Sequence, residues 1–381
     1  MPFELLGLGT ANPVNVITRA EGLGIAQVLS DPVVARSSFL PDIYAGSGVN
    51  TRHMVHGRDV VRDVLDGTRR SGSPFLPGAD PLGPTTGVRM RMYAEFAPPL
   101  ATAAAERALT DSGLSAGAVT HLVPVSCTGF VAPGVDEALV RTLHLRPDVQ
   151  RVQVGYMGCH GAVNGLRTAL AFASDPAAVV LVVAVELCSL HYYYGLSADK
   201  VVANALFADG AAAVVGKGRM TSRDRQGAGV ENPLPGGRGS SPPTLTATGS
   251  CLFPDTAGLM GWVIGDHGFE MVLSKKIPAA IEAGLGPWLT GWLKSQGLGV
   301  ADVGSWAVHP GGPKILDATE AALKLPPDAL AESRGVLADY GNMSSPTVLF
   351  IVDRMRKRNA PRPWVLLGFG PGLVAEAALI R

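Results

Sequence analysis

The chain has 381 residues, of which 47% are hydrophobic and 17% charged, a composition that predicts a globular protein with a sizeable core. Its 32 basic and 32 acidic residues give a formal net charge of zero, so charge gives no support for a nucleic-acid partner. The four cysteines, at positions 127, 159, 188 and 251, form no CxxC pair and no metal-ligand spacing, which favours a reduced, cytoplasmic protein without a metal site.

The chain shows no sign of a secretory or membrane segment. Its first residues lack the basic region of a signal peptide. The longest apolar run, near Val179–Val185, is far too short to cross a bilayer. We therefore expect a soluble protein with no membrane insertion.

The first hundred residues predict, in order, a strand, a helix, a loop, a Pro/Gly-rich connector and a long alanine-rich helix: Phe3–Leu8, Gly22–Ala35, Pro41–Arg52, Pro74–Pro84 and Ala97–Ser112. Gly7 and Gly9 lack the third glycine of a dinucleotide-binding motif. No carboxylate or cysteine stands near enough in sequence to His53 and His56 to make this pair a convincing metal site.

The stretch Gly155–Arg167 places a cysteine at the start of an apolar helix. Arg151–Met157 has the alternation of a strand, and Ala162–Ala173 is too apolar for any place but a buried layer. Cys159 thus lies where unpaired helix N–H groups and the positive end of the helix dipole favour the thiolate, which is a nucleophile. The alternative is that Cys159 is a small buried hydrophobic residue.

A strand-turn-helix pattern occurs in both parts of the chain. The strands His121–Ser126 and Val179–Glu186 flank the Cys159 segment, and Ser305–Val308 and Trp364–Gly368 flank the apolar helix Thr347–Lys357. His309 and Asn342 are separated by almost the same number of residues as Cys127 and Cys159. This agreement predicts an α/β protein built from two duplicated halves.

We expect the N-terminal half to span residues 1–220 and the C-terminal half to span residues 221–381. The junction lies within Gly216–Gly258, where glycine, proline, serine and threonine cluster. Much of Thr221–Ser241 is expected to be a mobile loop.

Superposing the halves brings three reactive residue types together. Cys159 and Asn342 fall at equivalent helix starts and His309 at a strand end, which is where α/β sheets bind ligands. A cysteine and a histidine make an activated thiolate, and an amide can orient the imidazole or bind an oxyanion. Taken alone, His309 is equally a buried core histidine and Asn342 a helix N-cap.

Several motifs resemble those of one family. Three runs are similar to signatures of type III polyketide synthases, the chalcone-synthase-like enzymes. They are His309–Asp317 (His-Pro-Gly-Gly-Pro-Lys-Ile-Leu-Asp), Tyr340–Ser345 (Tyr-Gly-Asn-Met-Ser-Ser) and Gly368–Leu373 (Gly-Phe-Gly-Pro-Gly-Leu). Ala205–Ala212 and the Cys159 segment match as well. The resemblance covers essentially the whole chain. It implies a thiolase-like five-layered αβαβα fold of duplicated halves, a homodimer, and chain extension with malonyl-type thioesters.

The resemblance also assigns roles. Cys159 resembles the acyl-accepting nucleophile, and His309 and Asn342 the pair that activates it and holds the thioester oxygen during decarboxylation. Phe207 and Phe269 resemble two aromatic gatekeepers between a coenzyme A tunnel and the cavity. The positions that resemble cavity-lining residues of the family are Cys127, Thr128, Cys188, His191, Gly261 and Ser344. Acyl-CoA and malonyl-CoA are then the substrates, and no further cofactor is implied.

The grip on coenzyme A departs from the pattern of plant members. Pro41–Thr51 has none of the basic residues that plant members usually carry near the tunnel entrance, and Arg52 is the nearest one. Lys314 stands where a small residue is common. We expect Arg52 and Lys314 to contact the phosphates of coenzyme A as exposed charges. The stretch His191–Tyr194 looks bacterial rather than plant-like.

Other functions remain open from the sequence. A β-ketoacyl carrier-protein synthase of the third type shares the fold and the Cys/His/Asn set, and a papain-like hydrolase shares the set alone. A non-catalytic scaffold that binds acyl thioesters is a further alternative. For the starter group, the small residues Cys127, Cys188 and Gly261 favour a medium or long fatty acyl chain, which leads to a pyrone or a resorcinol or other phenolic product.

Overall fold

The computed structural model describes residues 1–78, 80–195, 198–219 and 241–381. Its central sheet has the strand order β12-β13-β14-β9-β1-β8-β7-β4-β5, and β6 also pairs with β4. The strands of the N-terminal half are β1 (Phe3–Ala11), β4 (His121–Ser126), β5 (Gln150–Arg151), β6 (Val154–Gly155), β7 (Val179–Leu187) and β8 (Asp209–Gly218). Those of the C-terminal half are β9 (Thr244–Leu252), β12 (Ser305–Val308), β13 (Trp364–Gly370) and β14 (Val374–Ile380).

The two halves repeat one strand pattern. In the first, β4 and β7 are parallel, and β8 and β1 follow antiparallel. In the second, β12 and β13 are parallel, and β14 and β9 follow antiparallel. The halves meet where β1 pairs with β9 through Phe3↔Leu245 and Glu4↔Thr244. The duplication that the residue spacings predict is therefore present in the fold.

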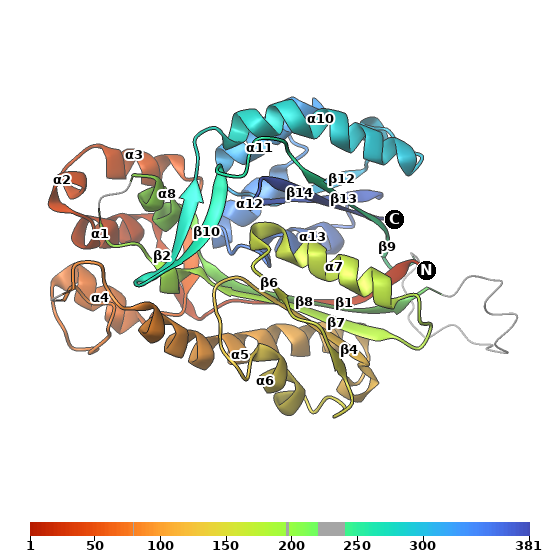
Figure 1. Cartoon of the computed structure of the whole chain (residues 1–381), viewed down its shortest axis with the longest axis horizontal. Helices are drawn as coiled ribbons and strands as arrows, with labels where there is room; N and C mark the ends of the chain where they lie inside the picture. The colour runs from red at the N-terminus through yellow and green to blue at the C-terminus, as the bar shows by residue number, and fades with distance from the viewer. Residues whose placement is uncertain (79, 196–197, 220–240) are drawn as a thin grey trace, which may run out of the picture.

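Helices cover both faces of each half-sheet and give five layers (Figure 1). The helices α5 (Thr86–Ser112) and α6 (Val135–Thr142) pack on one outer face, and α10 (Ile277–Ser295) and α11 (Pro313–Leu323) on the other. Between the half-sheets lie α7 (Gly161–Phe172) and α13 (Thr347–Lys357), whose side chains share one core with both. The middle layer is apolar because it meets protein on both sides. The thiolase-like αβαβα architecture is confirmed.

Smaller elements close one end of the molecule. They are β2 (Asn15–Thr18), α1 (Arg19–Leu29), α2 (Pro32–Ala35), α3 (Phe39–Gly46), β3 (Thr51–Met54), α4 (Arg58–Asp66) and α8 (Ala198–Leu206). The helix α12 (Ala331–Tyr340) instead packs against α13. Single 3₁₀ turns cover Ala116–Ala118, Gly158–His160, Cys188–His191 and Val300–Asp302.

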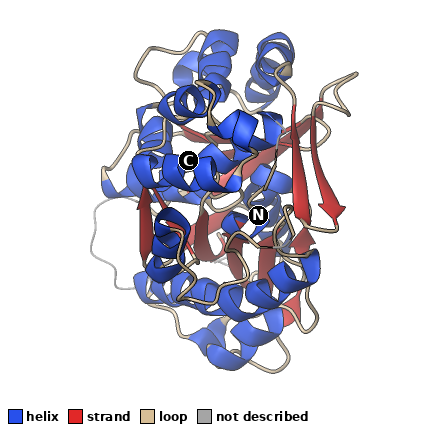
Figure 2. Cartoon of the chain, turned by 90° about the vertical axis from the view of Figure 1, so that its left-hand side faces the viewer, coloured by secondary structure: helices blue, strands red, loops and turns tan. Residues whose placement is uncertain are grey.

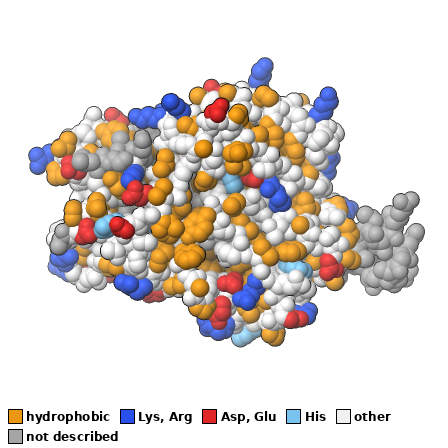
Figure 3. Space-filling view, in the orientation of Figure 1, with side chains coloured by type: hydrophobic (Ala, Val, Ile, Leu, Met, Phe, Trp, Pro, Cys, Tyr) orange, Lys and Arg blue, Asp and Glu red, His pale blue; other side chains and the backbone are white. Residues whose placement is uncertain are grey.

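A hairpin of β10 (Met260–Gly265) and β11 (Gly268–Leu273) stands apart from the central sheet (Figure 2). Its outer face carries the exposed side chains of Val263 and Val272, and Ile264, on the opposite face near the end of β10, is exposed as well. Figure 3 shows hydrophobic side chains gathered on the face of the molecule where this hairpin lies.

Some local expectations are wrong. Pro41–Arg52 is not a loop, because α3 includes Pro41 in its first turn, where proline is tolerated, and β3 begins at Thr51. The long helix α5 begins at Thr86, ahead of Pro98 and Pro99. The strand expected over Arg151–Met157 reduces to the two-residue strands β5 and β6.

The expected boundary at residue 220 and most of the loop Thr221–Ser241 lie outside the described residues. No helix among the described residues is both long and apolar enough to cross a membrane.

Candidate active site

Cys159 lies in a tight turn that leads into α7. It belongs to the 3₁₀ turn Gly158–His160, and α7 begins at Gly161. Gly158 has a φ of +72°, and a Cβ there would stand 2.6 Å from Cδ of Pro371. Glycine thus lets this turn approach the loop after β13 closely. The sulfur is buried, with 8% of the residue exposed.

The thiol form of Cys159 is favoured in the resting site. Burial raises the pKa of the Cys159 thiol to about 11, although hydrogen bonding from Ser344 acts in the opposite direction. The expectation that the helix start alone favours the thiolate is therefore wrong, because desolvation of the sulfur outweighs it. A base must remove the proton when the thiol reacts.

His309 and Asn342 are held by their backbones. His309 follows β12, and its N–H donates to the carbonyl of Leu367 in β13 at 2.8 Å. Asn342 forms a bridge with Phe207, in which its N–H donates to the carbonyl of Leu206 at 2.8 Å. Its side-chain oxygen accepts the N–H of Ser344 at 2.8 Å.

Three side-chain atoms at this site are buried and have no hydrogen-bond partner: Nδ1 and Nε2 of His309 and Nδ2 of Asn342. His309 is 1% and Asn342 1% exposed. Burial and then the charge of His160 lower the pKa of His309 to about 3, so the imidazole is neutral in the resting site and one of its ring nitrogens keeps a lone pair. Buried polar atoms without partners are uncommon in folded proteins, and here they can serve a substrate oxygen.

A cavity of about 20 Å³ lies beside Cys159. It holds about one water-sized sphere. Of the residues expected at the site, it is lined by Cys127, Thr128, Cys159, Cys188, Phe207 and Ser344. The structure thus brings the nucleophile together with four of the six expected cavity residues and one of the two expected gatekeepers.

His191 and Phe269 line a neighbouring cavity of about 230 Å³. Their rings stack with centroids 4.3 Å apart, and the N–H of Phe269 donates to Nδ1 of His191 at 2.9 Å. Nε2 of His191 then donates to the carbonyl of Thr128 at 2.7 Å. Phe269 is therefore not at the boundary of the Cys159 cavity; Met271, two residues along β11, lines both cavities.

Gly261 does not line either cavity. It pairs with Val272 in the hairpin, and a Cβ on Gly261 would meet the Val272 side chain at 3.6 Å. Its neighbours Met260 and Trp262 point to the opposite face and line the Cys159 cavity, because successive strand residues alternate. Gly261 is therefore not a cavity-lining residue, contrary to what the family resemblance implies.

Trp262 fills much of the space that the small residues were expected to leave. Its indole N–H donates to the carbonyl of Cys127 at 2.8 Å, and its ring lies edge-on to His191 and Phe269. It lines both cavities and separates them. The period-two pattern of a strand starting at Met260 is the sequence signal that identifies it.

Glu186 is a second residue that the sequence did not assign. It is fully buried at the end of β7, and burial raises the pKa of its carboxyl group. Its oxygens accept hydrogen bonds from the N–H groups of Cys127 and Thr128 at 2.9 and 3.0 Å and from the hydroxyl of Ser345 at 2.6 Å. Glu186 therefore ties the Cys127 loop of one half to the Asn342 loop of the other.

Arg52 is buried, contrary to expectation. It is 3% exposed, and its guanidinium donates to the carbonyls of Asn204 and Phe207. It therefore supports the backbone near Phe207 and is not an exposed charge. Lys314 is exposed at the start of α11 and lines a separate cavity of about 430 Å³ with Leu206 and Lys275.

The described residues contain no group of three or more His, Cys, Asp or Glu side chains that could hold a metal ion.

Comparisons with known proteins agree over nearly the whole chain. The family model for the N-terminal domain of chalcone and stilbene synthases matches residues 2–218, and the model for the C-terminal domain matches residues 244–381. The chain is 41% identical over 286 residues to a 1,3,6,8-tetrahydroxynaphthalene synthase of Streptomyces peucetius subsp. caesius, which covers 74% of this chain and 72% of that protein.

It is also 32% identical over 381 residues to the alpha-pyrone synthesis polyketide synthase-like Pks18 of Mycobacterium tuberculosis, which covers 98% of this chain and 89% of that one. Among solved structures, PKS-I of the brown alga Ectocarpus siliculosus has a TM-score of 0.88 and 31% identity, covering 100% of this chain and 99% of that chain.

Proposed function

This chain belongs to the chalcone and stilbene synthase family and is a type III polyketide synthase, and on that premise we propose that Cys159 carries the acyl chain while His309 and Asn342 serve decarboxylation of the extender. The supporting observation is the set of unpartnered atoms: both ring nitrogens of His309 and Nδ2 of Asn342 are buried with no hydrogen-bond partner. Loops that merely fill a core satisfy such atoms internally.

In the proposed cycle, His309 accepts the proton of Cys159 as the sulfur attacks the starter acyl-CoA, and coenzyme A leaves as the thiol. A malonyl thioester then loses CO2, and the electron pair of the broken bond forms an enolate. His309 and Nδ2 of Asn342 donate hydrogen bonds to the enolate oxygen, and each such donor typically changes the rate by about 10²–10³. The enolate carbon attacks the Cys159 thioester, and the extended chain returns to the sulfur for the next round.

No metal or bound cofactor is required by this chemistry, because the base, the nucleophile and the oxyanion donors are side chains of the chain itself. Acyl-CoA and malonyl-CoA are the proposed substrates. The exposed Lys314 and the neighbouring Lys275 line a cavity of about 430 Å³ that also contains Leu206, next to Phe207. We place the phosphates of coenzyme A there.

For the starter we propose an aliphatic acyl group, with a pyrone or a resorcinol or other phenolic product. The walls of the Cys159 cavity are apolar, and Pks18, a relative over nearly the whole chain, is named for alpha-pyrone synthesis. The cavity of about 20 Å³ accepts little beyond a short chain while Trp262 stays in place. A longer acyl chain must pass Trp262 into the cavity of about 230 Å³. Each methylene buried there contributes about 0.8 kcal/mol.

We also propose that the protein acts as a cytoplasmic homodimer. Phe130 is 74% exposed and lies near Tyr156, with ring centroids 6.5 Å apart; Tyr156 and Met157 are each 40% exposed. Exposed aromatic groups in contact with each other favour an interface. Light scattering measures the molar mass in solution and should give a dimer for the wild type and a monomer for Phe130→Asp. A monomeric wild type would refute the proposed homodimer.

Acyl loading tests the central assignment. Intact-protein mass spectrometry after incubation with hexanoyl-CoA should show one acyl group on the wild type and none on Cys159→Ala. The matched control Cys251→Ala, which removes a cysteine outside both cavities, should load like the wild type. Acylation of Cys159→Ala would refute the assignment.

A further inference from the structure

The cavity of about 230 Å³ reaches from the Cys159 cavity to the surface of the molecule. At its inner end it shares four wall residues with the Cys159 cavity: Cys188, Phe207, Trp262 and Met271. Its outer end, called the mouth below, is lined by side chains that solvent partly reaches: Leu82, Lys200, His267 and Glu270. An acyl chain that extends from Cys159 into this cavity therefore has its far end toward the mouth.

The tip of the β10–β11 hairpin forms one side of the mouth and is well held on the side of α5. The N–H of Thr86 donates to the carbonyl of Asp266 at 2.7 Å, and its hydroxyl accepts the N–H of Gly268 at 2.8 Å. Nε2 of His267 donates to the carboxylate of Asp80 at 2.8 Å. Several contacts must therefore break together before the tip leaves α5.

On the side of α8 the hairpin is held by much less. The ammonium of Lys200 in α8 forms an ion pair with the carboxylate of Glu270 in β11 and lies over the ring of Tyr193, 4.6 Å from its centroid. Among the described side chains, this ion pair is the only polar contact between the hairpin and α8. Because both of its members line the cavity, the pair spans the mouth.

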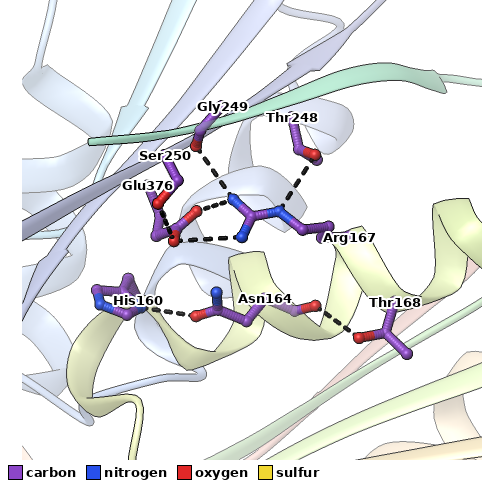
Figure 4. Close-up of polar contacts among 8 residues, drawn as sticks. All are labelled: His160, Asn164, Arg167, Thr168, Thr248, Gly249, Ser250 and Glu376. Carbon is purple, nitrogen blue, oxygen red and sulfur yellow. Dashed lines mark hydrogen bonds and ion pairs between the residues drawn. The ribbon is translucent and has the colours of Figure 1, made fainter. Parts of the chain in front are cut away.

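An ion pair with a purely structural role has a different setting in this protein. Figure 4 shows Arg167 of α7 paired with Glu376 of β14, and both groups are also hydrogen-bonded to β9. Glu376 is buried, whereas the side chain of Glu270 is 42% exposed and has no hydrogen-bond partner but Lys200 in the part of the chain that the structure describes. A pair so exposed contributes little to stability and is screened by salt, so a ligand can separate it.

We propose that the ion pair Lys200–Glu270 closes the mouth and so sets the longest acyl chain that Cys159 accepts. A chain that ends inside the cavity leaves the pair intact. A longer chain has to separate the two charges, and its last carbons then meet water and bury no further apolar surface. The inference rests on the proposed function, in which Cys159 carries an aliphatic acyl group. No covalent bond forms or breaks at Lys200 or Glu270.

The test is a competition between hexanoyl-CoA and palmitoyl-CoA, mixed in equal amounts, for loading of Cys159. Intact-protein mass spectrometry at early times gives the ratio of the two acyl groups, from which contacts with coenzyme A cancel because both substrates carry it. In Lys200→Met and in Glu270→Gln the ratio of palmitoyl to hexanoyl should rise by up to about fivefold, the upper range for an ion pair of this exposure. The double variant should show no further rise, since both single changes break the same contact.

Salt tests the same contact in the unaltered protein. Raising the ionic strength from about 0.1 M to about 1 M shortens the screening length from about 10 Å to about 3 Å. The ratio of palmitoyl to hexanoyl should then rise in the wild type and stay constant in the double variant. The matched control is Glu320→Gln, which breaks a partly exposed ion pair with Arg334 between α11 and α12, and it should behave like the wild type.

Three results would overturn the inference. They are an unchanged ratio in both single variants, a wild-type ratio that does not respond to salt, and a rise in the double variant equal to the product of the two single rises, which would mean that the residues act separately. Failure of the proposed function looks different. If the wild type takes up neither acyl group, or Cys159→Ala takes them up equally well, the acyl-carrier assignment is wrong and this inference falls with it.

Discussion

Replacing Trp262 by alanine should lengthen the acyl chain that the enzyme accepts. The indole lines both the cavity of about 20 Å³ at Cys159 and that of about 230 Å³ beside it, so its removal joins them. A buried methylene contributes about 0.8 kcal/mol, roughly fourfold in kcat/KM. Four more methylenes, the difference between hexanoyl-CoA and decanoyl-CoA, should thus change the ratio of their kcat/KM values by about two orders of magnitude in favour of decanoyl-CoA.

The assay is kcat/KM with acetyl-, hexanoyl-, decanoyl- and palmitoyl-CoA and malonyl-CoA, with products identified by mass spectrometry. Loss of the hydrogen bond to the Cys127 carbonyl should lower the free energy of unfolding by about 1 kcal/mol, and loss of the packing of the half-buried ring on His191 and Phe269 by about 2–4 kcal/mol more, so the melting temperature of the variant is measured beside the kinetics. Val263→Ala is the matched control, since Val263 is the next residue of β10 and is 55% exposed. An unchanged chain-length profile in Trp262→Ala, or the same change in Val263→Ala, would refute the reasoning.

Other variants test the remaining assignments. Cys159→Ala should abolish product while part of the malonyl-CoA decarboxylation survives, whereas Asn342→Ala should lose both activities, measured by CO2 release and chromatography; full-length product from Cys159→Ala would contradict this. In His309→Gln, alkylation of Cys159 should keep rising with pH toward the thiol pKa of about 11, because burial disfavours the thiolate and the base is gone; a plateau at neutral pH would contradict it. Lys314→Ala should raise KM for acyl-CoA more than it lowers kcat, and the effect should shrink with salt, as expected for an exposed charge; a salt-independent KM would exclude the contact. Arg52→Ala should instead lower the melting temperature, since its guanidinium holds backbone carbonyls; an unchanged melting temperature would show otherwise.

The layered fold and the duplication could be predicted because they depend on the order and spacing of apolar segments. The runs Val179–Glu186 and Thr347–Lys357 read as buried elements, and the structure has β7 and α13 there. Cys159, His309 and Asn342 each follow an element of this pattern, so their approach to one another follows from the topology.

The walls of the cavity could not be predicted in the same way. Gly261 and Trp262 are neighbours in sequence, and which of them faces Cys159 depends on the register of a hairpin outside the repeated pattern. The burial of Arg52 depends on carbonyls more than a hundred residues away in sequence, at Asn204 and Phe207. The protonation of Cys159 follows from desolvation, which a linear sequence does not display.

The carboxylate of Glu186 has a consequence for how the chain folds. It reaches its full set of hydrogen bonds only when the hydroxyl of Ser345, from the other half, is in place. The apolar faces of α7 and α13 likewise stay exposed until both half-sheets close on them. Although each half repeats the other, neither is a self-sufficient folding unit, and thermal unfolding should show one cooperative transition. Ser345→Ala should lower its midpoint while leaving it single, because the loss of one partner leaves a buried carboxylate less satisfied in an otherwise intact interface.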